Sequence, residues 1–89
     1  MFLIITYDVP SKRTQIYKKL IGEYLERNQN SVFFGEIKGS LYKDLMYRIN
    51  KIRINEDNLL YFIIENKNNI EVLGENKILK EKINDISII

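Results

Sequence analysis

The sequence predicts an α+β sandwich in which two helices cover one face of a small, mainly antiparallel sheet. Apolar runs at residues 1–8, 29–37 and 59–64 are rich in the branched and aromatic side chains that favour strands. Apolar residues at helical spacing predict helices over about 11–27 and 39–52. A chain of 89 residues is long enough for one small domain with a single core.

The first predicted strand ends in a candidate acidic site. Residues 1–5 are all apolar, which predicts a buried strand that continues through Tyr7 to Asp8. Pro10 ends the strand, and Ser11 is expected to cap the helix that follows. Asp8 therefore stands at the carboxyl end of a central strand. Two interpretations are open: it turns or caps the chain, or its carboxylate holds a divalent metal against phosphate.

Two absent residue types limit the chemistry. The sequence has no cysteine and no histidine, which excludes disulfides, thiolate and imidazole metal sites, a cysteine nucleophile and a histidine base. Catalysis would have to use carboxylates with a hard cation, or Lys, Tyr and Ser. The lack of cysteine fits a reducing compartment, and no apolar run is long enough to span a bilayer. We therefore expect a cytoplasmic protein without a membrane partner.

Charge is distributed unevenly along the chain. Residues 1–54 contain ten Lys and Arg against five Asp and Glu, a net charge of +5, whereas residues 55–89 contain four against seven, a net charge of −3. This asymmetry predicts one basic face that could meet an anionic partner. A solvated helix surface is the competing interpretation of the basic residues early in the first helix, which are Lys12, Arg13, Lys18 and Lys19.

Each predicted helix should bury one apolar stripe. The stripes consist of Ile16, Leu20, Ile21, Tyr24 and Leu25 in the first helix, and of Leu41, Leu45, Ile49 and Ile52 in the second. Ser40 is expected to cap the second helix. Residues 29–37 form either one strand bent or bulged at Gly35 or two short strands. The expected order is strand, helix, strand, helix, strand, strand, with the last strand at 70–73.

The open face of the sheet needs a cover. The strand predicted at 59–64 is apolar on both faces, and two helices are enough for one face of the sheet. A second copy of the chain packed sheet to sheet is the economical solution. The end of the chain, about residues 75–89, closes with isoleucines and is expected to form a docking tail or a swapped strand.

An ordered set of short motifs resembles a known family. Tyr7-Asp8-Val9 follows the first strand, Ser31-Val32-Phe33 stands in the next extended segment, and the apolar run 59–64 comes later. The short length, the strand end at 72–74 and the isoleucine tail fit as well. This order resembles the smaller of the two universal CRISPR adaptation proteins, the Cas-two family. The similarity covers nearly the whole chain.

The resemblance implies a ferredoxin-like fold over residues 1–89 and a homodimer packed sheet to sheet. It implies a role in spacer acquisition, in which the dimer binds duplex DNA and bridges copies of the larger CRISPR integrase subunit. Some members are also assigned a metal-dependent endonuclease activity on single-stranded RNA or double-stranded DNA. In such a member, one Mg²⁺ or Mn²⁺ ion is shared between the Asp8 residues of the two subunits.

The resemblance also implies roles for particular residues. Asp8 matches the family's metal-binding and catalytic aspartate. The basic positions that would meet the nucleic-acid backbone match Lys12, Arg13, Arg27 and Lys38, and the supporting positions match Tyr7, Ser31 and Phe33. Phe34 stands where many members have an acidic residue, so a second carboxylate near the site is missing.

Three functions are consistent with the sequence. A structural integrase subunit needs no active site, because Lys and Arg contacts to phosphate supply affinity without reading sequence. A metal-dependent phosphodiesterase would use the Asp8 pair as a minimal Mg²⁺ site. A non-catalytic ferredoxin-like module that binds a protein or a small ligand is the third, because this fold hosts many functions. Arg13 has two interpretations, a phosphate contact or an ion pair with Asp8.

Overall fold

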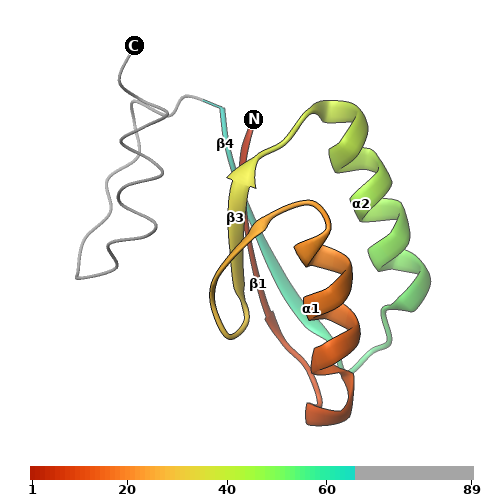
Figure 1. Cartoon of the computed structure of the whole chain (residues 1–89). Coiled ribbons are helices and arrows are strands. Elements are labelled where there is room, and N and C mark those ends of the chain that lie inside the picture. Colours follow the sequence, from red (N-terminus) through yellow and green to blue (C-terminus); the bar gives the residue numbers. More distant parts are fainter. Residues whose placement is uncertain (66–89) are drawn as a thin grey trace.

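The computed structural model describes residues 1–65, and their elements alternate as strand, helix, strand, strand, helix, strand (Figure 1). In chain order the elements are β1 (Phe2–Asp8), the short 3₁₀ helix η1 (Ser11–Arg13), α1 (Thr14–Gly22), β2 (Glu26–Gln29), β3 (Val32–Glu36), α2 (Gly39–Ile52) and β4 (Asn58–Ile64). The strand predicted at 70–73 and the tail predicted at 75–89 lie outside the described residues.

The strands form one antiparallel sheet in the order β2-β3-β1-β4. β1 lies in the interior of the sheet, where Ile5 stands opposite Phe33 of β3 on one side and Tyr61 of β4 on the other. At the end of β1, Asp8 stands opposite Asn58, the first residue of β4. Both helices lie on the same side of this sheet (Figure 1). The α+β, ferredoxin-like class predicted from the sequence is confirmed.

The first helix is shorter than predicted. α1 ends at Gly22, and the amides of Tyr24 and Leu25 both bond back to the carbonyl oxygen of Ile21, at 3.0 and 2.9 Å. Glycine is a weak helix former, and these bonds satisfy the Ile21 carbonyl group in the last turn as the chain leaves the helix. Tyr24 and Leu25 continue the apolar spacing past this end, which is why the sequence pattern overestimates the helix.

Neither predicted serine cap forms. The 3₁₀ turn that starts at Ser11 follows Pro10 with no side-chain capping bond, and α2 begins at Gly39 after Lys38, also without one. The proline conformation itself directs the chain into the turn, because its ring fixes φ near the helical value. Ser40 lies within the first turn of α2.

The segment after α1 forms two short strands, which is one of the two alternatives left open for residues 29–37, but the first strand begins earlier, at Glu26. The predicted element order, with one strand between the two helices, is wrong here. β2 and β3 pair as a hairpin whose register shifts between Arg27 and Gln29. β2 was missed because its four residues, Glu26–Gln29, are all polar and show no apolar alternation. The irregularity therefore lies in β2 and not at Gly35, where a bulge or bend was predicted.

The core lies between the sheet and the two helices. It contains Leu3, Ile5 and Tyr7 of β1, Phe33 of β3, and buried residues of both helices. The helix residues in this core are Tyr17, Leu20, Ile21, Leu45 and Ile49. Two residues of the predicted stripes, Ile16 and Leu41, are instead 44% and 47% exposed. Tyr17 occupies the central place in α1 that the sequence pattern did not assign to the core.

The opposite face of the sheet is also apolar, and neither α1 nor α2 covers it (Figure 1). Alternate residues of paired strands share a face, so Ile4, Phe34 and Phe62, which stand side by side in the register, belong to this open face. Phe34 is buried against Phe2, with ring centroids 6.2 Å apart. Leu60 and Phe62 are 62% and 49% exposed, which leaves an uncovered apolar surface on β4.

Candidate nucleic-acid and metal site

A pocket of about 390 Å³ lies where β1 ends. Four parts of the chain meet there: the end of β1, the start of α1, β2, and the β2–β3 turn. The lining residues are Tyr7, Asp8, Val9, Thr14, Gln15, Lys18, Arg27, Asn30 and Ser31. The pocket therefore contains four of the residues singled out by the sequence, namely Tyr7, Asp8, Arg27 and Ser31.

Asp8 is the acidic residue of this pocket. It is exposed and stands at the last position of β1, where its backbone pairs with that of Asn58. Within residues 1–65 its carboxylate makes no hydrogen bond or ion pair, so it does not act as the cap or turn residue that one interpretation expected. Both carboxylate oxygens are therefore available to a ligand.

Tyr7 holds the floor of the pocket in place. Its hydroxyl donates to the carbonyl oxygen of Asn30 at 3.4 Å, and its amide donates to that of Ser31 at 3.1 Å. Its ring lies between those of Tyr17 and Phe33, with centroids 5.6 and 6.1 Å away. Burial raises the pKa of the Tyr7 hydroxyl, although the positive charge of Arg27 opposes the shift. Tyr7 thus packs the core and fastens the β2–β3 turn to β1.

Two cations line the same pocket. Arg27 is exposed and donates to the side-chain oxygen of Asn30 at 3.0 Å, and Lys18 of α1 is half-buried. A carboxylate and two cations around one cavity can bind a phosphodiester, with the cations on phosphate oxygens and the carboxylate on a metal or a hydroxyl group. From the sequence, Lys18 was open to two interpretations, a solvated helix surface or a basic position near Asp8, and it was not among the predicted site residues. Lys18 follows Thr14 by four residues, so the two lie on the same face of the helix. Because Thr14 stands near the strand end at Asp8, this spacing could have placed Lys18 at the site.

Lys12 and Lys38 do not line this pocket. Lys12 is exposed in η1, and Lys38 is exposed at the opposite end of the sheet, just after Ile37, whose amide bonds to Met1. Since β1 rises about 3.3 Å per residue, its two ends are roughly 20 Å apart. A contact by Lys38 would therefore fall on a different part of any bound nucleic acid.

Arg13 pairs with Asp57, and the hypothesis of an ion pair with Asp8 is wrong. The Arg13 Nε donates to both oxygens of Asp57, at 3.1 and 3.0 Å, and Nη2 lies 3.0 Å from Oδ2. Nη2 also donates to the carbonyl oxygen of Ile52. Within the described residues, the Arg13 guanidinium thus bonds to the connection between α2 and β4. The phosphate contact predicted for Arg13 stays a prediction.

The Asp57 carboxylate is fully buried and receives donors from three residues. Besides Arg13, the hydroxyl of Tyr17 and the amide of Ile54 both donate to Oδ2. Burial favours the neutral carboxyl, but the hydrogen bonds from Arg13, Tyr17 and Ile54 outweigh it and lower the pKa of Asp57. The negative charge is thus retained inside the protein and ties η1, α1 and the α2–β4 connection together.

The described residues do not complete a metal site on their own. In residues 1–65, no group of three or more acidic side chains lies close enough together to hold an ion, and Asp8 is the acidic residue lining this pocket. An exposed carboxylate is a suitable ligand for Mg²⁺, which keeps several waters and needs only one or two carboxylates from protein. Residues 1–65 of one chain offer one such ligand in this pocket.

Within the described part of the chain, no helix combines the length and the apolar character that crossing a membrane requires.

Comparison with known proteins identifies the family. The family model described as CRISPR associated protein Cas2 matches residues 1–72. The chain belongs to this family. Its curated relatives include a Haloferax volcanii protein, 39% identical over 66 residues, which cover 74% of this chain and 77% of the relative. A Thermotoga maritima protein is 32% identical over 80 residues, covering 86% of this chain and 92% of the relative. Both are named CRISPR-associated endoribonuclease Cas2.

Solved structures agree with this assignment. A crystal structure of cas2 matches with a TM-score of 0.74 and 36% identity, over 86% of this chain and 90% of the other. The crystal structure of Streptococcus pyogenes Cas2 matches with a TM-score of 0.68 and 28% identity, over 83% of this chain and all of the other. The Cas2 family and the names of its members support a role in CRISPR adaptation, as the sequence motifs predicted.

Replacing Asp57 with Ala should strongly destabilise this Cas2-family chain. The change leaves the Arg13 guanidinium, whose side chain is 25% exposed, without its carboxylate. Removing one partner of a buried pair is costly, and we expect the melting temperature to fall by about 15 °C or more. Differential scanning calorimetry measures this. Glu56→Ala, at the exposed neighbouring position, is the control, with an expected change below about 3 °C. Equal effects of the two variants would contradict a structural role for the cluster.

Tyr17 should make the free energy of unfolding fall as pH rises in the alkaline range. Burial and the hydrogen bond to Asp57 raise the pKa of Tyr17 from 10.0 to about 12. Between these values the unfolded chain loses the phenolic proton and the folded chain keeps it, so the free energy of unfolding falls as pH rises. Below pH 10 the group contributes no pH dependence. The free energy of unfolding, measured by urea titration at a series of pH values, should therefore fall more steeply with pH for wild type than for Tyr17→Phe between pH 10 and about 12. If the two proteins show the same dependence on pH, the Tyr17 pKa is not raised.

Proposed function

We propose that the chain acts in CRISPR adaptation as a homodimer that binds duplex DNA and bridges copies of the larger integrase subunit. The observation that supports this most is the pocket at the end of β1, where Asp8 lies with Lys18 and Arg27. Family membership supplies the biological setting. A second proposed function, metal-dependent cleavage of RNA or duplex DNA, is favoured by the names of the relatives and by the exposed Asp8.

The proposed dimer uses the open face of the sheet. Leu60 and Phe62 are exposed there beside Ile4, and the helices occupy the other face. Burial of apolar surface is worth about 25 cal/mol per Å², so pairing two such faces stabilises both chains. Phe34 belongs to the same face but is buried against Phe2, so it supports this surface from below and adds no exposed area to it.

Duplex DNA binding rests on cations that the described structure leaves without acidic partners. Lys12, Lys18 and Arg27 form no ion pair with residues 1–65, whereas Arg13 is paired with Asp57. Contacts from such cations to phosphate are independent of sequence and release counterions. A symmetric dimer doubles this basic surface, as expected for a subunit that has to hold a duplex in place.

For the nuclease function, Asp8 of each subunit would hold one Mg²⁺ or Mn²⁺ ion between the chains. Such an ion lowers the pKa of a bound water and polarises the phosphate. Lys18 and Arg27 would position the phosphodiester by charge-assisted bonds to its oxygens. Tyr7 and Phe33 keep the strand end in place by packing, and Ser31 contributes its carbonyl oxygen to the bond from Tyr7.

Asp8→Ala separates the two proposed functions. Cleavage of labelled single-stranded RNA and duplex DNA is measured with Mg²⁺, with Mn²⁺ and with EDTA, alongside duplex binding. If Asp8 holds the ion, cleavage by Asp8→Ala falls to the level seen with EDTA while duplex binding persists, because the phosphate contacts remain. Glu56→Ala removes an exposed carboxylate outside the pocket and should cleave like wild type. Metal-dependent cleavage that survives in Asp8→Ala would contradict the nuclease assignment.

The double variant Lys18→Gln and Arg27→Gln tests the nucleic-acid surface. Duplex affinity falls as salt rises, and the slope of this fall is the change in log K per unit change in log salt concentration. Each lost phosphate contact should make the fall less steep by about 1. Fluorescence anisotropy over a salt series measures the slope. Lys43→Gln is the matched control, since this exposed lysine of α2 does not line the pocket. An unchanged slope in the double variant, or no binding by wild type at low salt, would favour a module that binds protein or a small ligand.

A further inference from the structure

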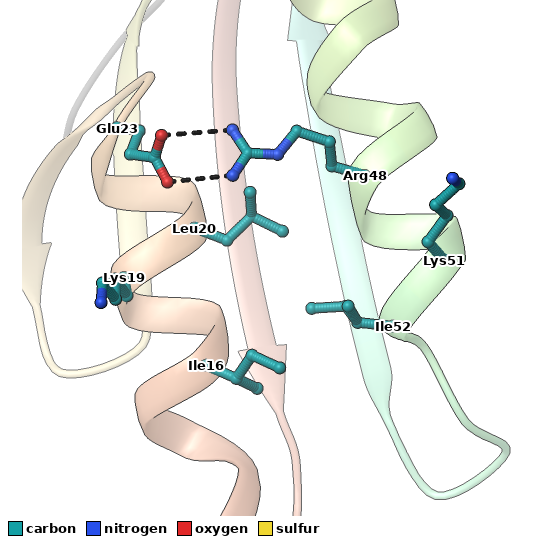
Figure 2. Close-up of a pocket in the computed structure, with 7 residues that line it drawn as sticks. All are labelled: Ile16, Lys19, Leu20, Glu23, Arg48, Lys51 and Ile52. Atoms are coloured by element: carbon teal, nitrogen blue, oxygen red, sulfur yellow. Dashed lines mark hydrogen bonds and ion pairs between the residues drawn. The ribbon is translucent and has the colours of Figure 1, made fainter.

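A second cavity, of about 340 Å³, lies between the two helices. Its lining residues are Ile16, Lys19, Leu20, Glu23, Arg48, Lys51 and Ile52. Figure 2 shows Ile16, Leu20 and Ile52 pointing toward one another across the gap between α1 and α2, with the Glu23–Arg48 pair at one end. We call these seven residues the helix groove. It shares no residue with the pocket that contains Asp8.

The floor of the helix groove is apolar and reaches the solvent. Leu20 is buried and Ile52 half-buried, but Ile16 is 44% exposed, although it belongs to the apolar stripe predicted for α1. Tyr17 takes the core position next to it, so the fold does not use the Ile16 side chain for its own core. Together with Leu20 and Ile52, Ile16 forms an apolar floor between two helices, the kind of groove into which an amphipathic helix lays its apolar face.

One end of the helix groove is built by fixed polar contacts. Both terminal nitrogens of Arg48 bond to Glu23, at 3.2 and 3.1 Å, and Nη1 also donates to the Tyr24 hydroxyl at 2.8 Å. The Tyr24 hydroxyl in turn donates to Asp44. The hydrogen bond from Arg48 is the main cause of the lowered pKa of the Glu23 carboxyl. This end is therefore fixed, and its two charges neutralise each other.

The flanks of the helix groove keep a net positive charge. Lys19 and Lys51 stand on the outer sides of α1 and α2 in Figure 2, and neither forms an ion pair with residues 1–65. The Lys51 ammonium lies over the exposed ring of Tyr47, 4.7 Å from its centroid, on the flank of α2 that borders the groove lining. An occupant needs apolar side chains for the floor and carboxylates for the two lysines.

We propose that the helix groove binds an acidic amphipathic helix of another protein, with aliphatic side chains between α1 and α2 and carboxylates on Lys19 and Lys51. Nucleic acid fits less well, because the floor is aliphatic and the Glu23 carboxylate stands in the lining. A second copy of the chain has the open sheet face available on the other side of the sheet. The groove would thus stay accessible in a sheet-to-sheet dimer, and the inference does not depend on cleavage or DNA binding.

The test uses a designed peptide of about 16 residues, with leucines at helical spacing on one face and glutamates on the other. Its binding to the full chain is measured by fluorescence anisotropy, and its site by amide chemical shifts in NMR spectra. Wild type should bind saturably, with shifts concentrated at Ile16, Leu20 and Ile52. A peptide in which lysines replace the glutamates should bind at least about ten-fold more weakly, because Lys19 and Lys51 repel it.

Two matched variants locate the binding. Ile16→Asp places a carboxylate on the floor at an exposed position, and the affinity for the acidic peptide should fall at least about ten-fold. Leu41→Asp makes the same kind of change at a similarly exposed residue of α2 outside the groove, and should change affinity less than about two-fold. Circular dichroism confirms that both variants are folded.

Three results would overturn the proposal. The first is no saturable binding of the acidic peptide to folded wild type. The second is equal affinity of Ile16→Asp and wild type, or peptide shifts on the open sheet face. The third is a duplex DNA that shifts the same groove amides and displaces the peptide, which would assign the groove to nucleic acid.

Discussion

The buried carboxylate of Asp57 is the constraint on which the functional end of the molecule depends. It stands next to Asn58, which pairs with Asp8, and it binds Arg13, the last residue of the turn that follows Asp8. Tyr17 adds a bond from α1, so strand, turn and helix are fastened at one point. A charge this deeply buried is tolerated only because three residues donate to it. With both neighbouring segments fixed, Asp8 has a defined position although its own side chain is exposed.

One chain supplies only part of the proposed site, and a second copy of the chain would supply the rest. A single chain brings Asp8, Lys18 and Arg27 around one pocket, where the two cations could contact a phosphodiester group. The described residues of one chain offer one carboxylate there, so the proposed metal site uses Asp8 of the second subunit as well. The open sheet face with Leu60 and Phe62 is the surface that would bring the two chains together. The proposed metal site would therefore depend on dimer formation, whereas the proposed contacts of Lys18 and Arg27 to the nucleic-acid backbone would not depend on the metal.

The sequence predicted those elements whose apolar pattern is strong and local. β1, α2 and β4 were placed correctly, and with them Asp8 at a strand end, because each has a long apolar run or a regular helical repeat. β2 was missed because it is polar throughout, and the end of α1 because Leu25 stays buried after the helix has ended. The partner of Arg13 is 44 residues away in the chain, and only the fold brings Asp57 to it. Lys18 could have been recognised from its helical spacing to Thr14, whereas the role of Tyr17 in the core depends on tertiary packing.

We propose that two chains pair through the open sheet face and so bring their Asp8 residues to one ion. Sedimentation equilibrium of wild type and Leu60→Glu, with Leu41→Glu as a control on the helical side, tests it most directly. Leu60 and Leu41 are both exposed, so neither change removes core packing. We expect a dimer for wild type and for Leu41→Glu, and a folded monomer for Leu60→Glu. A dimer that survives Leu60→Glu unchanged, or a wild-type monomer at micromolar concentration, would contradict it.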